Sequence, residues 1–374
     1  MPLTFEEYQA KKIINVHKHV DGPWFWGKYS AHPYVGCRSG CEFCYVRGSR
    51  YIGRHDPDAF DTLIRVKTNA VELFQKEIVR LEKDIITCGD WQQPAEARYR
   101  LSRQMLEIVK QVAFPLFIVE RSPLLIRDLD ILAEINQQSW VGVQFSISNV
   151  DPALKRAFEP RSPGVKRRLQ AMAELAGAGI QVGTALMPVL PFVGDDRQQI
   201  EEAVKATVDH GGTFLVSGGL TMDGVQAERT MRAMDTFDPE AGQKMRQFYG
   251  YMPDGKHNFG PPRAYNARLG LTARELCEKH GLLDRMPRYI LPGPLAVNKQ
   301  ISEKLFLKTY ELELEQAKDY RIWAYRKAAW TVDELPESIL EIYKAKGKAG
   351  LVELPAVGDR IASQIIQWLE QVKT

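Results

Sequence analysis

The chain has 374 residues, enough for one large hydrophobic core and a small additional domain. Hydrophobic residues make up 44% and charged residues 26% of the sequence, which is typical of a globular protein and excludes a disordered one. With 50 basic and 47 acidic residues the net charge is +3, which excludes a strong overall field directed at nucleic acid or at a membrane.

Two further features of the sequence indicate the cellular compartment of the protein. Residues 1–10 lack the apolar core of a signal peptide, and no later run approaches 18 apolar residues. The five cysteines are an odd number, and three of them stand in one short loop, which argues against a disulfide framework. We therefore expect a cytoplasmic protein with no membrane partner.

Residues 1–29 are expected to form an N-terminal extension that is first polar and then aromatic. Trp24, Phe25, Trp26 and Tyr29 stand in one short run. Such a run can cover the end of a barrel, or it can offer a stacking platform for a base. Both interpretations stay open at this point.

Residues 34–45 hold three cysteines at C-x3-C-x2-C spacing. These are Cys37, Cys41 and Cys44. Three thiolates on one loop can occupy three corners of a cubane iron–sulfur cluster, and Gly36 and Gly40 let the backbone wrap closely around it. The fourth iron would then be free to bind a small molecule. The alternative is a zinc site closed by His32 or His55, although no second C-x2-C unit is present.

Beyond this loop, arginines interleave with tyrosines. Arg47, Arg50 and Arg54 alternate with Tyr45 and Tyr51. The pattern is compatible with the mouth of a substrate site and with a solvated loop.

From residue 63 onward short apolar runs alternate with amphipathic stretches. The runs expected to be buried strands are 85–88, 116–119, 141–147, 181–186 and 213–216, and the expected helices are 70–81, 95–112, 129–135, 165–176 and 198–208. This alternation predicts an α/β fold with a parallel sheet or barrel of about six units. In such a fold the active groups stand at the carboxyl ends of the strands.

Polar residues follow several of these strands. Gly89 and Asp90 can approach a bound ammonium, and Arg121 can hold a carboxylate. Ser146 interrupts an apolar strand, and Arg161 follows the next turn. The alternatives are an ordinary turn at Gly89 and a serine whose hydroxyl is satisfied by backbone.

The cysteine spacing, with Phe43 before the third cysteine, resembles the signature of the radical S-adenosylmethionine (SAM) enzymes. The resemblance implies a partial (β/α)6 barrel and a [4Fe–4S] cluster on Cys37, Cys41 and Cys44, with Phe43 beside the adenine of SAM. One electron from a reductant such as flavodoxin or ferredoxin would cleave SAM to a 5′-deoxyadenosyl radical. That radical would take a hydrogen atom from the substrate.

Five further stretches resemble the DNA-repair-photolyase-like branch of this superfamily, which is related to spore photoproduct lyase. They are Pro33-Tyr34-x-Gly36-Cys37, Val66-Lys67-x-Asn69-Ala70, Gly89-Asp90 with Gln93-Pro94-Ala95-Glu96, Ser122-Pro123-Leu124 with Arg127-Asp128, and Glu159-Pro160-Arg161-x-Pro163. The resemblance implies that Gly89 and Asp90 lie at the amino group of SAM, and Arg121 and Ser146 at its carboxylate. Arg121 stands where this branch usually carries Lys. Arg161 is a further candidate for cofactor binding.

Spore photoproduct lyase itself uses a cysteine after the second strand as hydrogen donor, together with a tyrosine relay. By this resemblance Cys88 would be the donor and Tyr45 the relay, although Cys88 is displaced by one position and Phe43 replaces a second tyrosine. The alternative for Cys88 is a small residue packed in the core.

The C-terminal part is expected to be entirely helical. Residues 296–315 are predicted to be a helical linker, and residues 316–374 resemble the helix-hairpin-helix domain at the front of family X DNA polymerases. The matching stretches are Tyr320-Arg321-Ile322-x-Ala324-Tyr325-Arg326 and Leu354-Pro355-Ala356-Val357-Gly358-x-x-Ile361-Ala362. Ala356 replaces the first glycine of the hairpin, and Asp359 stands where a basic residue is common. Both DNA binding and a docking or architectural role therefore stay open.

These observations predict four segments: an extension at 1–29, a radical SAM partial barrel at 30–295, a linker at 296–315 and a helix-hairpin-helix domain at 316–374. The predicted function is a radical SAM enzyme acting on a DNA lesion, as a carbon–carbon lyase of the DNA-repair type. One alternative is a radical SAM enzyme for a small molecule or peptide with a structural tail. The other is a non-catalytic, zinc-stabilised nucleic-acid-binding protein.

Overall fold

The structure is a computed structural model that describes residues 2–53 and 55–372. The chain forms two compact units, and each is described by itself. The first comprises residues 1–16 and 29–286, and the second comprises residues 17–28 and 287–374.

The first unit is built around a sheet with six parallel strands. They are β3 (Tyr29–Ala31), β6 (Ile86–Gly89), β7 (Leu116–Glu120), β8 (Val141–Ser146), β9 (Gln181–Val189) and β10 (Phe214–Gly219). They stand in this order across the sheet, and the short strand β2 (Ile14–Val16) adds antiparallel to β3 at one edge. The predicted α/β partial barrel is therefore confirmed, with all five predicted strands present.

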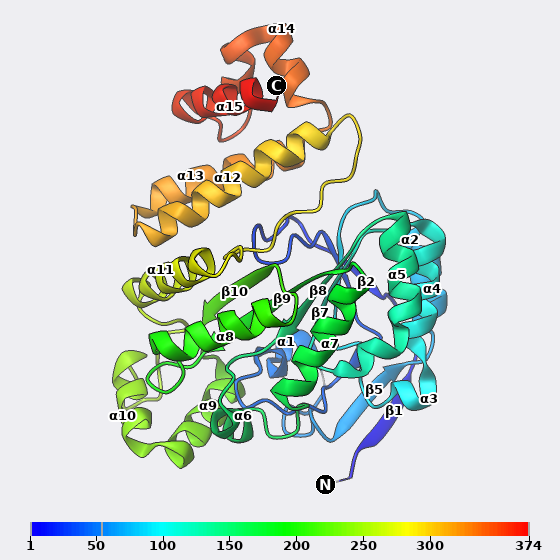
Figure 1. The fold of residues 1–374 in the computed structure, drawn as a ribbon, viewed down its shortest axis with the longest axis vertical. Coiled ribbons are helices and arrows are strands. Elements are labelled where there is room, and N and C mark those ends of the chain that lie inside the picture. Colours follow the sequence, from blue (N-terminus) through cyan, green and yellow to red (C-terminus); the bar gives the residue numbers. More distant parts are fainter. Residues whose placement is uncertain (1, 54, 373–374) are drawn as a thin grey trace. The chain divides into compact units, whose positions relative to one another are not determined.

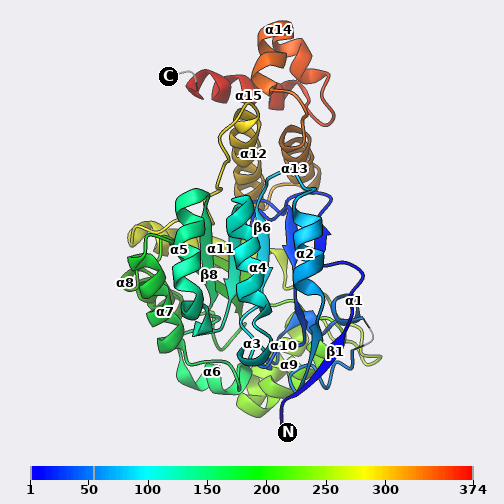
Figure 2. The same cartoon turned by 90° about the vertical axis from the view of Figure 1, so that its right-hand side faces the viewer.

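Helices cover one face of this sheet (Figure 1). They are α2 (Ala70–Ile78), α4 (Leu101–Val112), α5 (Leu129–Gln138), α7 (Val165–Gly177), α8 (Arg197–Asp209) and α11 (Arg263–Lys279). Figure 2 shows α2, α4 and α5 side by side along this layer. Apolar side chains from alternate strand positions, such as Ile86, Ile118 and Val143, fill the space between sheet and helices.

One predicted helix is divided. The pattern predicts a single helix over 95–112, but α3 (Glu96–Tyr99) ends and α4 begins at Arg100, which has a left-handed φ of 51°. Further elements escaped the sequence analysis: β1 (Thr4–Tyr8), β4 (Tyr34–Val35), β5 (Leu63–Lys67), η1 (Tyr45–Arg47), α1 (Ser49–Ile52), η2 (Pro123–Asp128), α6 (Pro152–Phe158), α9 (Gly224–Phe237) and α10 (Pro239–Phe248).

The N-terminal residues do not form a separate extension. Strand β1 pairs in parallel with β5, and β4 pairs with β5 from the other side, so these three strands make a second small sheet in the first unit. Residues 17–28 instead belong to the second unit. Both assignments differ from the predicted extension because strand pairing and aromatic packing join segments distant in sequence.

Trp26 of the aromatic run packs inside the second unit, whereas Tyr29 lies in β3 of the first unit. Trp26 is 0% exposed, and its ring makes an edge-to-face contact with Phe306 at a centroid distance of 5.6 Å. The guanidinium of Arg288 lies 4.9 Å from the centre of the same ring. Trp26 is therefore a core residue of the second unit, and neither barrel cladding nor a base platform describes it.

The rest of the second unit is helical, as predicted. Its helices are α12 (Ala296–Leu314), α13 (Asp319–Asp333), α14 (Ile339–Val352) and α15 (Asp359–Val372). The expected linker coincides with α12, whose buried residues include Ile301, Leu305 and Phe306. It is an integral helix of this unit, since it packs along α13.

No helix among the described residues is long and apolar enough to cross a membrane.

Candidate functional site

The cysteine loop runs from β4 to η1, and its first turn depends on a glycine. Gly36 has a φ of +100°, and a Cβ at this position would lie 2.6 Å from the backbone oxygen of Leu63. The backbone N–H of Cys37 donates to the carbonyl oxygen of Phe60 at 2.9 Å. The loop is therefore packed directly against the chain that leads into β5.

Backbone contacts hold the loop from two more sides. The N–H of Arg38 donates to Oε1 of Gln93 at 3.1 Å, and the N–H of Glu42 donates to the carbonyl oxygen of Phe158 at 2.9 Å. The hydroxyl of Thr230 donates to the carbonyl oxygen of Glu42 at 3.1 Å. Segments following β6, ending α6 and within α9 thus converge on the cysteines.

Asp90 is the strand-end residue that meets the first cysteine. Its Oδ1 accepts a hydrogen bond from Cys37 Sγ at 3.3 Å, and its own φ is +55°, in the left-handed region. Gly89 precedes it at the end of β6, where its carbonyl oxygen lies 3.1 Å from Nδ1 of His32. The structure therefore brings both predicted ammonium contacts to the edge of the cysteine loop.

The buried carboxylate of Glu120 joins the ends of β6 and β7. It accepts backbone N–H bonds from Gln92 at 3.1 Å, from Arg121 at 2.8 Å and from Ser122 at 3.1 Å. Burial, and next the nearby carboxylate of Asp90, raise the pKa of Glu120 to about 7, and these three bonds oppose that rise. Glu120 thereby fixes the backbone on which Asp90 and Arg121 stand.

Arg121 is held by a second buried carboxylate. Its guanidinium NH1 lies 2.6 Å from Glu159 Oε1, and the guanidinium lies 5.7 Å from the centre of the Phe43 ring. Glu159 also accepts from Arg168 at 2.5 Å and from the Ser148 hydroxyl at 2.6 Å. Burial alone would raise the pKa of Glu159, but the two guanidinium groups outweigh it and hold that pKa well below its usual range.

The remaining predicted cofactor residues lie around this cluster. Ser146 ends β8 half-buried, and its carbonyl oxygen accepts from Arg168 at 2.7 Å. Arg161 forms an ion pair with the buried Asp61, close to Gly40 of the cysteine loop. Arg161 therefore lies beside the cysteine loop, and its side chain is 39% exposed.

Two predicted catalytic residues lie in contrasting surroundings. Cys88 is 0% exposed in the main core, and strand alternation sends its side chain to the same face as Ile86. Tyr45, directly after the third cysteine, is 53% exposed and makes an edge-to-face contact with Tyr51. Arg54, which the sequence pattern groups with these tyrosines, lies outside the described residues.

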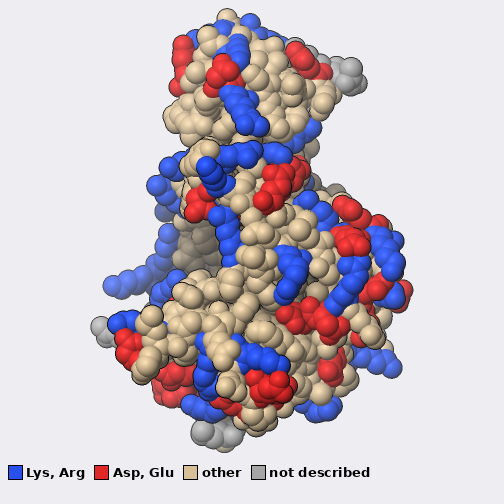
Figure 3. Space-filling view, turned by 90° about the vertical axis from the view of Figure 1, so that its left-hand side faces the viewer, with Lys and Arg blue, Asp and Glu red and all other residues tan. Residues whose placement is uncertain are grey.

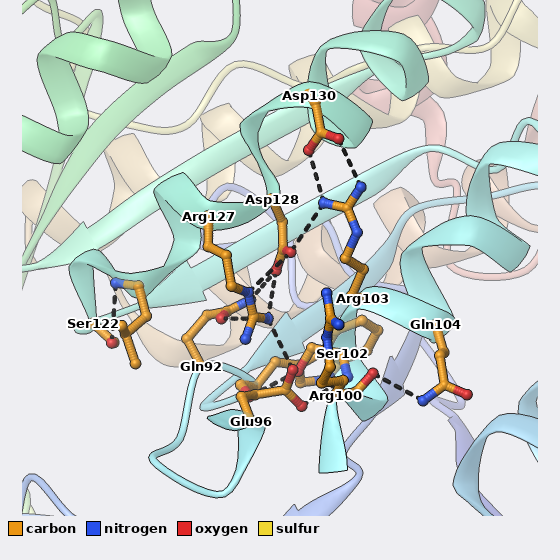
Figure 4. A network of polar contacts seen from close by, with 12 residues as sticks. Gln92, Glu96, Arg100, Ser102, Arg103, Gln104, Ser122, Arg127, Asp128 and Asp130 are labelled. Carbon is orange, nitrogen blue, oxygen red and sulfur yellow. Dashed lines mark hydrogen bonds and ion pairs between the residues drawn. The ribbon is translucent and has the colours of Figure 1, made fainter. Parts of the chain in front are cut away.

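A polar network supports the loop after β6 (Figure 4). The Asp128 carboxylate accepts from Gln92 Nε2 at 3.0 Å and from Arg127 at 2.8 Å. Arg127 also reaches Glu96 at 2.9 Å. These stretches, which carry part of the family resemblance, act here by shaping the backbone.

The chemistry of the three thiols fits an iron–sulfur cluster with one open corner. Cys37 and Cys41 are buried and Cys44 is half-buried, and burial raises the pKa of the Cys41 thiol to about 12 while Arg121 opposes this. In the part of the chain that is described, no three or more His, Cys, Asp or Glu side chains stand in the arrangement of a closed metal site. Binding iron would replace the thiol proton that Cys37 now donates to Asp90.

One of the two histidines considered for a zinc site, His55, is occupied elsewhere. Nδ1 and Nε2 of His55 lie 2.8 Å and 2.9 Å from the backbone oxygens of Asp56 and Leu63. His55 is therefore not available to complete a tetrahedron with the cysteines.

The lysines that precede the hairpin of the second unit have acidic partners. Ala356 adopts a φ of +60°, and the three lysines before the hairpin each pair with a carboxylate: Lys344 with Glu341, Lys346 with Glu353, and Lys348 with Asp359. On the face shown in Figure 3, basic and acidic side chains are interspersed over each unit. This mixed charge pattern provides little electrostatic attraction for the phosphate backbone of a nucleic acid.

Glu120 was not predicted as a site residue, and Glu159 was noted only as part of a stretch that carries the family resemblance. A glutamate directly after an apolar strand could have indicated such a residue, because a buried carboxylate there needs hydrogen-bond donors. Which N–H groups and guanidinium groups those donors are depends on tertiary contacts.

Residues 32–207 match the model of the Radical SAM superfamily, and residues 298–374 match that of a Helix-hairpin-helix domain. An uncharacterized protein of Mycobacterium tuberculosis (strain ATCC 25618 / H37Rv) is 28% identical over 253 residues, which are 66% of this chain and 74% of that protein. An uncharacterized protein of Methanocaldococcus jannaschii is 27% identical over 208 residues, covering 55% of this chain and 76% of the relative.

Solved structures of spore photoproduct lyase share the fold. A mutant with dinucleoside spore photoproduct gives a TM-score of 0.54 at 15% identity, covering 75% of this chain and 80% of that one. A mutant with bound AdoMet and the same dinucleoside gives 0.53 at 16% identity, covering 76% and 82%. At this identity the likeness establishes the fold alone.

Proposed function

Because this chain carries a radical SAM domain followed by a helix-hairpin-helix domain, we propose that it is an enzyme that cleaves SAM reductively and directs the resulting radical at a DNA lesion. The observation that carries the proposal is the meeting of residues from separate strands at one cysteine loop. Asp90 contacts Cys37, and Arg121 lies over Phe43 beside Cys41.

Cys37, Cys41 and Cys44 would hold three irons of a [4Fe–4S] cluster. When bound, the cluster would supply the electron that splits the sulfonium of SAM into methionine and a 5′-deoxyadenosyl radical. A low-potential protein reductant such as flavodoxin or ferredoxin would be the electron donor.

Each remaining residue has a binding or orienting task. Arg121, held by Glu159, would bind the methionine carboxylate, with Ser146 next to it on the neighbouring strand β8. Asp90 and the carbonyl group of Gly89 would receive the ammonium, and Phe43 would pack beside the adenine. Arg161 would keep the loop in place through Asp61.

Tyr45 is the exposed residue that could pass a hydrogen atom to or from a substrate. Cys88 is enclosed by apolar side chains, so the proposal assigns it to packing. The hydrogen-donor role that the resemblance gives Cys88 stays a prediction.

DNA as substrate is supported by two resemblances of different parts of the chain, one to spore photoproduct lyase with its dinucleoside and one to the helix-hairpin-helix domain. The balanced charge at the hairpin implies that it contributes little affinity of its own.

The test begins with anaerobic purification and measurement of iron and labile sulfide per chain. We expect about four of each in the wild type, and a large loss in Cys37→Ala, Cys41→Ala and Cys44→Ala. Cys277→Ala, a change in the packed helix α11, is the matched control and should keep both. One zinc per chain without sulfide would contradict the proposal.

The second step is reduction with dithionite in the presence of SAM. We expect 5′-deoxyadenosine to form, and to form faster with ultraviolet-damaged oligonucleotides than with undamaged ones. If 5′-deoxyadenosine forms but no DNA accelerates its formation, the radical chemistry is supported and DNA is not the substrate. A small molecule or a peptide would then be the expected substrate.

A further inference from the structure

Tyr45 and Tyr51 form an exposed aromatic pair immediately after the third cysteine. Tyr45 begins η1 and is 53% exposed, and Tyr51 stands in α1 and is 47% exposed. Their ring centres are 5.3 Å apart, with planes inclined at 77°. Large aromatic surfaces of this kind are normally covered in a protein, so this pair is a candidate contact for a ligand.

Backbone turns connect the two tyrosines to the third cysteine. The N–H of Gly48 donates to the carbonyl oxygen of Tyr45 at 3.0 Å, and the N–H of Tyr51 donates to that of Gly48 at 2.9 Å. Two consecutive turns therefore fix the backbone at both tyrosines relative to Cys44. A tyrosine side chain has only two rotatable angles, so it loses little entropy when a planar ligand stacks on it.

A cation accompanies the rings. The guanidinium of Arg50 lies 4.9 Å from the centre of the Tyr51 ring, and its side chain is 58% exposed. Its ion pair with Asp223 is long, at 3.8 Å, and Asp223 is equally exposed. A weak, solvated pair of this kind is readily exchanged for a phosphate oxygen.

Three other described arginines near the loop already have partners within the protein. Arg229 pairs with Glu42 at 2.9 Å, Arg161 pairs with Asp61, and buried Arg47 donates to the carbonyl oxygen of Pro57 at 2.8 Å. Arg50 is therefore the arginine of this group that is best placed to meet a ligand from solvent.

We propose that Tyr45, Tyr51 and Arg50 form a stacking platform for an unpaired base of single-stranded DNA, with Arg50 binding an adjacent phosphate. This rests on the proposed function, since it names how the substrate reaches the same site. Stacking on tyrosine requires an exposed base face, so a single strand or an extruded nucleotide fits and an intact duplex does not.

The test is fluorescence anisotropy of a labelled 15-nucleotide oligothymidylate with the full chain, in the absence of SAM. We expect Tyr45→Ala and Tyr51→Ala each to weaken binding about tenfold, because one base–aromatic stack contributes about that factor. Tyr45→Phe keeps the ring and should bind within about twofold of the wild type. Tyr320→Ala removes a tyrosine that is 69% exposed in the second unit and is the matched control.

Arg50→Gln should lower the affinity and reduce the slope of log affinity against log salt by about 0.7, the value for one phosphate contact on a single strand. An otherwise identical duplex should bind more weakly than the single strand. Circular dichroism melting of each variant confirms that the exposed substitutions leave the fold intact.

Three results would overturn the platform: no binding of the single strand at low salt, wild-type affinity in both alanine variants, or equal loss in Tyr45→Phe and Tyr45→Ala. Formation of 5′-deoxyadenosine without oligonucleotide is measured in parallel for every variant. It reports on the radical chemistry alone, so failure of the platform and failure of the proposed function are distinguished.

Discussion

The Glu159 carboxylate lies 2.6 Å from the guanidinium of Arg121 and fixes the direction of that side chain beneath the cysteine loop. The same carboxylate accepts hydrogen bonds from Arg168 and from two serine hydroxyls, those of Ser148 and Ser162. A buried anion shared by two guanidinium groups can be removed only at high cost, because both cations then lose their partner.

We therefore expect Glu159→Gln to lower the free energy of unfolding of the first unit by about 3 kcal/mol or more. Urea unfolding followed by circular dichroism measures this change. The matched control is Glu275→Gln, which breaks an exposed pair with Arg197 and should cost less than about 1 kcal/mol. If both variants lose a similarly small free energy of unfolding, the buried Glu159 carboxylate does not stabilise the first unit as expected.

Gly36 gives a second prediction, on the shape of the loop. At a φ of +100° an alanine is strained, and its Cβ would meet the backbone oxygen of Leu63 at 2.6 Å. We expect Gly36→Ala to cost at least about 2 kcal/mol and to lower the iron bound per chain. Gly164→Ala, at a glycine with open space around it, should change neither quantity by much. Normal iron content in Gly36→Ala would mean that the loop tolerates a different path.

The sequence predicts the fold of the first unit well because its signals are local. Short apolar runs such as 141–147 and 181–186 become β8 and β9, and the cysteine spacing alone identifies the loop that anchors the site. The division of the predicted helix at Arg100 was missed, since nothing in the local pattern indicates a left-handed residue there.

Long-range pairing explains the rest of what was missed. Trp26 packs on Phe306 from 280 positions away, and Glu120 binds the backbone of Gln92 on the neighbouring strand–loop segment. Such partners follow from strand order and domain packing, which a single sequence does not record. The side chains at strand ends were predictable as a set, but their individual partners were not.

Lys67 gives a prediction on pH. Its ammonium donates to the carbonyl oxygen of His32 at 2.6 Å, and burial, opposed by the Glu77 carboxylate, lowers the pKa of Lys67 to about 8. Between pH 8 and about 10.5 the unfolded chain would hold this proton while the folded chain does not, so stability rises with pH in this window. Below pH 8 both states hold the proton, so the destabilisation caused by burying the charged Lys67 ammonium is fully present.

We expect Lys67→Met to remove this rise, which is about 3 kcal/mol, while leaving the fold intact. Urea midpoints at intervals from pH 7 to 10.5 measure it. Lys76→Met, at an exposed lysine paired with Glu72, should keep the wild-type slope. An unchanged slope in Lys67→Met would assign the pH dependence to other groups.

Substitution of Cys88 distinguishes a packing role of this residue from a catalytic one. It is 0% exposed in the core, so we expect Cys88→Ala to cost about 1 kcal/mol of stability and to leave both 5′-deoxyadenosine formation and product yield from a damaged oligonucleotide unchanged. Product analysis by mass spectrometry checks this. Normal SAM cleavage with misdirected or missing repair product would instead establish Cys88 as the hydrogen donor.

Ala356 gives the last prediction, in the hairpin between α14 and α15. It is an exposed non-glycine residue at a φ of +60°, where an L-residue pays about 1 kcal/mol or more. We expect Ala356→Gly to stabilise the second unit by about 1 kcal/mol, because relief of this strain exceeds the added freedom of the unfolded chain. Ala349→Gly, at an exposed position inside α14, should do the opposite by a similar amount. Thermal melting of the full chain measures both, and destabilisation by Ala356→Gly would mean that the hairpin does not hold this residue in the left-handed region.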